Sequence, residues 1–149
     1  MSETSAGHRS SLPRTIGRVV LGLFLLFTGI GHLTFGRAES IAQVPDWLPV
    51  GDDLVVVGSG VVELALGASL IALPRHRVVL GWIVAAFFVA IFPGNISQYV
   101  NRVDAFGLTS DLARGVRLIL QPLLVLWALW STGAWRDRGT LRSAIGRGR

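Results

Sequence analysis

Polar side chains that could do chemistry are sparse in this sequence, and several of them lie within or beside long apolar segments. Glu63 stands inside an apolar run, with Gly60 three residues before it and Gly67 four residues after it. Residues at this spacing share a helical face, and small residues let a second helix approach, so we expect Glu63 to face the interior of a bundle. An ionisable group in the hydrocarbon core is costly without a partner or water. Glu63 is therefore the first candidate for a functional residue.

Five further polar residues occur toward one end of the other apolar segments. Arg117 and Gln121 are four residues apart and so share a helical face. Asn95 and Gln98 follow a Pro-Gly pair that should kink or break a helix, and His32 lies near the end of the first apolar segment. The sequence therefore predicts one polar pocket that opens outward, whose candidate ligand or proton-relay residues are His32, Glu63, Asn95, Gln98, Arg117 and Gln121.

Each candidate also has a purely structural interpretation. Glu63 and Arg117 could be a buried ion pair that fixes helix register, which would couple the two charges. His32 could be a hydrogen-bonded helix residue, and Asn95 could cap the broken helix. A bis-histidine haem is not expected, because the other two histidines lie outside the apolar segments. The chain has no cysteine, and one histidine with one glutamate is too few for an ordinary metal site, so we predict none.

The elements that must position these residues are long apolar helices. The 149 residues are 51% hydrophobic and only 15% charged, whereas soluble domains carry about 25% charged residues. Four spans of roughly 20 residues use nearly all of the chain, and they are expected at about 16–35, 54–73, 78 to 95 or 99, and 116–133. We predict an all-α bundle of four transmembrane helices in residues 15–135, with a disordered polar tail at 1–14 and a basic tail at 136–149.

The arginines predict how the bundle is oriented. The chain has 14 arginines and no lysine, and ten of them lie at the start of the first span, in the turn at 74–77 or in the carboxyl tail. The positive-inside rule then places both chain ends on the cytoplasmic side of a plasma membrane. The same distribution explains the net charge of +5 by orientation and lipid contact, so no nucleic-acid partner is expected. The exclusive use of arginine suggests a GC-rich genome, and we expect the protein in a bacterial inner membrane.

Several segments in this order carry a family resemblance. They are GIGHLTF, VPDWLP, SGVVELALGASL, IFPGNISQYV and RGVRLILQPLLVLWAL. Together they resemble the DoxX-like membrane proteins over most of residues 16–135. The resemblance implies a four-helix membrane bundle and places Glu63, Asn95, Arg117 and Gln121 on the polar positions of the family pattern.

The resemblance also implies a range of functions. Some DoxX-like proteins are membrane subunits linked to quinone-coupled sulfur oxidation, others belong to oxidative-stress or thiol-redox complexes, and distant ones assist membrane-protein assembly. A direct thiol role is in doubt here because cysteine is absent. We expect a quinone-linked membrane subunit, with quinone as the possible cofactor and a membrane or soluble oxidoreductase as partner, without deciding whether the chain is itself an enzyme. The alternatives are a non-enzymatic scaffold or assembly partner, possible as a homo-oligomer, and a small-molecule or proton-coupled transporter.

Overall fold

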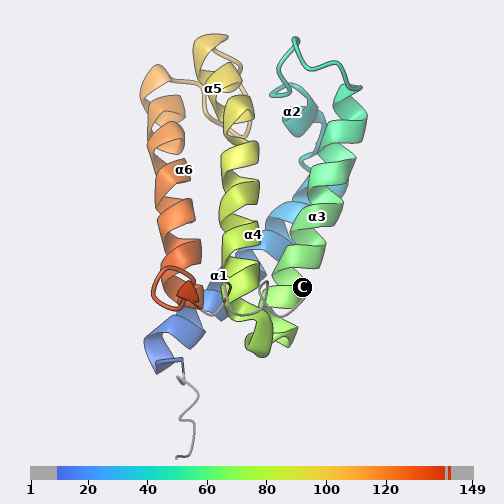
Figure 1. The fold of residues 1–149 in the computed structure, drawn as a ribbon. Helices are drawn as coiled ribbons and strands as arrows, with labels where there is room; N and C mark the ends of the chain where they lie inside the picture. Colours follow the sequence, from blue (N-terminus) through green and yellow to red (C-terminus); the bar gives the residue numbers. More distant parts are fainter. Residues whose placement is uncertain (1–9, 140, 142–149) are drawn as a thin grey trace, which may run out of the picture.

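A computed structural model describes residues 10–139 and 141 of the chain, and the described part is a bundle of helices (Figure 1). The helices are α1 (Leu12–Leu33), α2 (Arg37–Ile41), α3 (Asp52–Ala72), the short 3-10 helix η1 (Pro74–His76), α4 (Arg77–Ala90), α5 (Phe92–Val100) and α6 (Asp111–Thr132). Four segments are long and apolar enough to cross a membrane, namely α1, α3, the run from η1 to α5, and α6. The chain is thus a four-helix, multi-pass membrane bundle, as predicted.

The helix bounds differ from the prediction at three places. Helix α1 begins at Leu12, so 12–14 belong to the membrane helix rather than to a polar tail. Residues 1–9 of that tail, and 140 and 142–149 of the predicted basic tail, lie outside the described part. Helix α6 begins five residues earlier than expected, because the Ser110 side chain accepts a hydrogen bond from the Ala113 backbone N–H at 3.2 Å and caps it. The loop after α1 contains the short helix α2.

Helix α1 packs against α3 along a line of glycines, and the two form the first helical hairpin. A Cβ atom on Gly67 would lie 2.7 Å from the backbone oxygen of Gly22, and one on Gly29 would lie 2.9 Å from that of Gly60. Only glycine permits backbones to approach this closely. The prediction that the glycine face around Glu63 receives another helix is confirmed, and that helix is α1.

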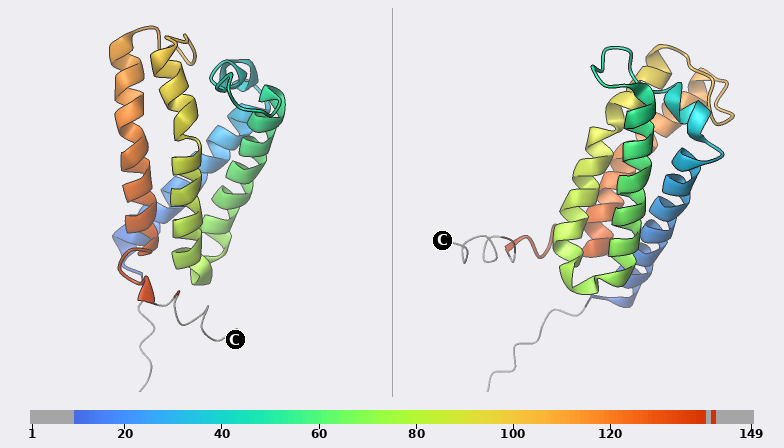
Figure 2. Two further views of the ribbon diagram at one scale, coloured as in Figure 1. Left: turned by 45° about the horizontal axis from the view of Figure 1, so that its top comes forward. Right: turned by 90° about the vertical axis from the view of Figure 1, so that its right-hand side faces the viewer.

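The second hairpin consists of α6 and the broken helix α4–α5. Helix α4 ends at Ala90, and α5 begins at Phe92 with Pro93 in its first turn, so the predicted break at Pro93 and Gly94 is confirmed. Figure 2 shows α4 and α5 running nearly end to end beside α6, while α1 crosses the bundle obliquely. The apolar core joins the two hairpins through Leu25, Leu70, Val84, Phe88 and Ala128.

Two arginines hold helix ends at one end of the bundle, which we call the η1 end because it holds η1, the start of α1 and the end of α6 (Figure 1). Arg18 is buried and donates to the backbone oxygen of Leu70 in the last turn of α3. Arg77 donates to the oxygen of Thr132, the last residue of α6, at 2.6 Å. Cations at helix carboxyl ends pair with otherwise unsatisfied carbonyls and with the helix dipole.

Candidate functional site

Between the two hairpins lies a cavity of about 490 Å³, which we call the main chamber. Its wall is largely aromatic and aliphatic, with Phe24 and Phe27 from α1, Phe88 from α4 and Leu120 from α6. Near its amino end α1 lies against α6, where the Trp127 indole N–H donates to the Gly17 oxygen at 3.2 Å, and α1 then crosses the bundle obliquely (Figure 2). The space left between the diverging helices faces the opposite end of the bundle, which holds α2 and residues 101–110 and is called the α2 end.

His32 and Glu63 form a direct pair on the first hairpin. The Nδ1 atom of His32 lies 2.8 Å from Oε2 of Glu63. The Glu63 side chain is 4% exposed and that of His32 is 23% exposed, so the carboxylate is enclosed while the imidazole reaches the chamber. An Nδ1–H that donates to the carboxylate leaves Nε2 available to a ligand. The structure thus corrects the hypothesis that Glu63 pairs with Arg117.

Arg117 is a cation without a carboxylate within ion-pairing distance in the described part of the chain. Its Nη1 donates to Oε1 of Gln98 at 3.0 Å, and its guanidinium lies 5.3 Å from the centre of the Phe106 ring. Gln98 is almost fully buried and also donates toward the backbone oxygens of Val103 and Ala105. Arg117 is therefore oriented by neutral groups, and its charge remains available to a ligand.

Gln121 joins the pieces of the second hairpin. Its amide nitrogen donates to the backbone oxygen of Phe88 at 2.7 Å, and its Oε1 accepts from Nδ2 of Asn95 at 2.9 Å. The Phe88 carbonyl lies in the last turn of α4, where the helix break removes its usual partner. One side chain on α6 thus holds α4 and α5 together across the break, and Asn95 is fixed against Gln121 at the chamber wall.

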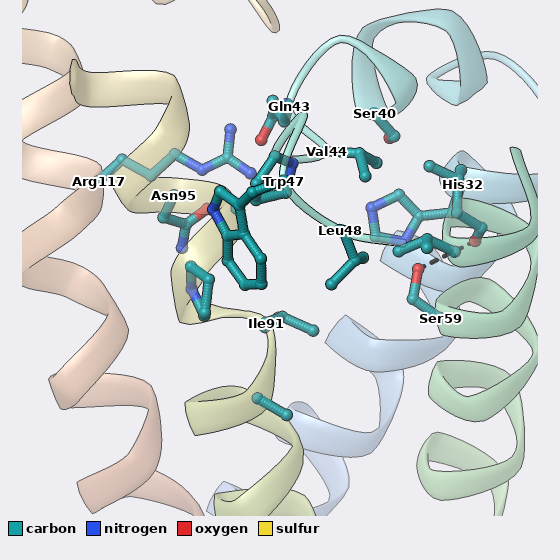
Figure 3. Close-up of a pocket in the computed structure, with 16 residues that line it drawn as sticks. His32, Ser40, Gln43, Val44, Trp47, Leu48, Ser59, Ile91, Asn95 and Arg117 are labelled. Carbon is teal, nitrogen blue, oxygen red and sulfur yellow. Dashed lines mark hydrogen bonds between the residues drawn. The ribbon is translucent and has the colours of Figure 1, made fainter. Parts of the chain in front are cut away.

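A second cavity of about 210 Å³ adjoins the main chamber and shares His32, Asn95, Arg117 and Ile91 with it; we call it the upper chamber. It lies beneath the loop from 42 to 51, and its other polar wall is supplied by the buried Gln43 and by Ser40. Figure 3 shows Arg117 and His32 on opposite sides of this space, with the Trp47 indole projecting between them. The two chambers therefore share three polar side chains, His32, Asn95 and Arg117.

At the α2 end, hydrogen bonds and ion pairs join α2, the loop from 101 to 110 and the start of α6. The Glu39 carboxylate accepts from the Phe106 backbone N–H at 2.6 Å, which ties α2 to the loop from 101 to 110. Arg114, buried on α6, pairs with Asp104 and with Asp111. These contacts hold Phe106 against Arg117, so the cation has a defined position.

The structure brings five of the six predicted residues to the main chamber, and they are His32, Glu63, Asn95, Arg117 and Gln121. Gln98 lies behind the wall and contributes by orienting Arg117. Sequence reasoning missed Gln43, Trp47 and Phe106, which the loops bring in. The two prolines that flank Trp47 were the available signal for an ordered loop. Within the described residues, no three His, Asp or Glu side chains gather as a metal site.

These observations define a multi-pass membrane protein with a polar site enclosed between two helical hairpins. The chain belongs to the family described as Domain of unknown function (DUF8561), whose model matches residues 21–132. The match runs from the first half of α1 to the end of α6 and includes every residue of the site described above. Neither the curated proteins nor the solved structures contain a significant match.

Proposed function

We propose that this chain is a DoxX-like, quinone-linked subunit of a bacterial inner membrane, which binds a quinone headgroup where the two chambers meet. The observation that carries this proposal is the placement of an unneutralised cation, Arg117, and a carboxylate-paired imidazole, His32, on opposite walls of one cavity. A quinone presents two carbonyl oxygens on opposite sides of a planar ring. Donors on opposite walls of the cavity thus suit that class of ligand.

The wall of the main chamber supports a flat, membrane-soluble ligand. Phe88 is buried in the wall, whereas Phe24, Phe27 and Leu120 also line the chamber and are 38%, 64% and 48% exposed. A cavity whose rim is apolar and lies within the membrane spans can be reached from the lipid. Aromatic rings stack favourably on a planar headgroup, while an isoprenoid tail can remain among the exposed phenylalanines.

The polar groups supply what reduction of a quinone requires. Reduction to the quinol takes up two electrons and two protons, and the electrons come from an oxidoreductase partner. His32 can pass a proton from Nε2 to one oxygen while the Glu63 carboxylate, held 2.8 Å from Nδ1, balances the imidazolium charge. Arg117 stabilises negative charge that develops on the other oxygen. The upper chamber lies beneath the loop from 42 to 51, and the second proton, as well as the proton that restores His32, would enter from that side.

Two other functions have less support. A scaffold whose glycine faces bind another membrane protein has to use glycines that are already engaged, because Gly22, Gly29, Gly60 and Gly67 are consumed by contacts between α1 and α3. A transporter would need a path through the bundle, but the core residues Leu25 and Val84 are fully buried between the main chamber and the η1 end. A homo-oligomer is compatible with quinone binding and does not replace it.

Quinone binding can be measured directly with the fluorescence of Trp47, which lines the upper chamber. A short-chain quinone titrated into the detergent-purified protein should quench tryptophan emission, and Trp47→Phe should remove most of the saturable component. Arg117→Gln should weaken binding by about ten- to a hundredfold, because a charge-assisted hydrogen bond is worth about 1.5–3 kcal/mol.

Arg102→Gln is the matched control, since Arg102 is at the same end and its side chain is 77% exposed. Unchanged quinone affinity in Arg117→Gln, with the protein still folded, would exclude the proposed site. Tighter binding of a fatty acid than of the quinone would reassign the chamber to an anionic lipid-soluble ligand.

A further inference from the structure

A third cavity lies at the η1 end, far along α6 from the site above. It is an apolar groove of about 420 Å³ between the first turn of α1, the last two turns of α6 and the segment that follows. Its floor and sides are Leu126, Leu129, Trp130 and Trp135, and the arginines that line it are Arg14 and Arg136. We infer that this groove binds one anionic phospholipid, with the acyl chain along α6 and the phosphate between the two arginines.

The apolar part of the groove faces outward, where lipid lies. Leu126, Trp130 and Trp135 are 61%, 49% and 60% exposed. Leu126 and Trp130 are four residues apart, so they form a continuous stripe that ends at the Trp135 indole. Tryptophan side chains favour the boundary between acyl chains and headgroups. An acyl chain lying on this stripe would therefore bring its headgroup to the level of Trp135.

The charges at that level favour an anion. Arg14 has no hydrogen bond or ion pair with any other residue that the structure describes. Arg136 pairs with Asp137 at 3.0 Å, and Arg77 pairs with the same carboxylate at 2.9 Å, while Arg138 lies 5.1 Å from the centre of the Trp135 ring. Among the described residues, Arg136 and Arg77 share the Asp137 carboxylate, so a phosphate beside Arg14 and Arg136 would add favourable negative charge.

The fold explains why these groups meet. Gly133 adopts a left-handed conformation with φ of 68° and ends α6, and the chain then turns so that Trp135 and Arg136 come beside the start of α1. The hydrogen bond from Arg77 to the Thr132 oxygen and the ion pair between Arg77 and Asp137 hold this turn in place. The groove is therefore built by ordered segments of the chain. Neither Arg14 nor Arg136 lies within the residues that the family model matches.

Native mass spectrometry of the full chain in detergent tests the inference. Phosphatidylglycerol and phosphatidylcholine with identical acyl chains are added in equal amounts, and the wild-type protein should retain one phosphatidylglycerol with at least about tenfold preference. Equal retention of the two lipids would overturn the inference, and this comparison needs no variant.

Substitution locates the lipid. Arg14→Gln should reduce the preference several-fold without altering the fold, because Arg14 has no partner in the described structure, and Arg14→Gln with Arg136→Gln should abolish it. Arg102→Gln, at the α2 end, should leave the preference unchanged. An equal loss in Arg102→Gln would show a general charge effect and refute the site. Displacement of the lipid by millimolar inorganic phosphate would show a site for a free anion and would also refute it.

Discussion

The two faces of α1 show opposite ways of meeting a neighbouring helix. Toward α3, glycines such as Gly22 and Gly29 bring backbones together until no further side-chain atom fits. Toward α6, the amino-terminal part of α1 contacts that helix at Gly17, and the phenylalanines Phe24 and Phe27 further along α1 line an open chamber. Small residues join the helices of one hairpin, and large ones hold two hairpins apart. Close packing and a binding cavity are therefore made by a single helix, through residues a few positions apart.

The close face can be broken by one added side chain. Gly67→Leu should lower the free energy of unfolding by about 3 kcal/mol, since even a Cβ would lie 2.7 Å from the Gly22 backbone oxygen. Thermal unfolding in detergent measures this loss. Gly58→Leu is the control on the same helix, because nothing lies within 4 Å of a Cβ built there. Equal stability of the two variants would contradict the packing described for α1 and α3.

The polar pair in the site lies within one hairpin: Glu63 pairs with His32 on the first hairpin, and the charge of Arg117 belongs to the second. A double-mutant cycle of His32→Leu and Glu63→Leu should give a coupling energy of about 1–2 kcal/mol, the upper part of the range for polar pairs in membranes. The cycle of Glu63→Leu with Arg117→Leu should be additive within about 0.5 kcal/mol. Coupling in the second cycle and none in the first would contradict the pairing of Glu63 with His32 and would support an ion pair between Glu63 and Arg117.

The η1 end contains a carboxylate, Asp137, whose contacts make stability depend on pH. Hydrogen bonds from Arg136 and from Arg77 hold the pKa of Asp137 below its ordinary value, although burial opposes them. The folded state therefore gains stability when Asp137 is ionised, and this gain is lost as the pH falls below about 4, through the pKa of the folded protein. The Tm of the wild-type protein should fall by a few degrees in that pH range. The Asp137→Asn variant should start with a lower Tm and should not show this additional fall. Parallel Tm profiles would exclude Asp137 as the cause.

The smallest effect is expected on the surface of the α2 end. Arg37 donates to the Asp53 carboxylate from Nη2 at 2.7 Å and from Nε at 2.8 Å, but the two side chains are 43% and 60% exposed. Arg37→Gln should therefore cost about 0.5 kcal/mol or less. Urea unfolding with and without added salt would detect a larger contribution, which would mean that the connection between α2 and α3 supports the chambers.

The sequence predicted what depends on periodicity and left out what depends on loops. Apolar length identified the four spans, and the Pro-Gly pair after Phe92 identified the break. Helix spacing correctly grouped Arg117 with Gln121 and placed Glu63 inside. The hypothesis that Glu63 pairs with Arg117 was wrong, because the depth of a residue along its helix does not determine which neighbouring helix lies beside it. His32 reaches Glu63 since the glycines set the register of α1 on α3, a geometric fact that residue types alone do not state.

The division of polar contacts between hairpins bears on how the protein is made. Glu63 is satisfied by His32 within the first hairpin, and Asn95 by Gln121 within the second. Exposed polar groups are expensive in lipid, so each hairpin can enter the bilayer with these groups already hydrogen-bonded to each other, before the two hairpins pack together. Each hairpin can then insert into the membrane separately, and the two can pack together afterwards. The ligand chamber lies at the interface that this last step forms.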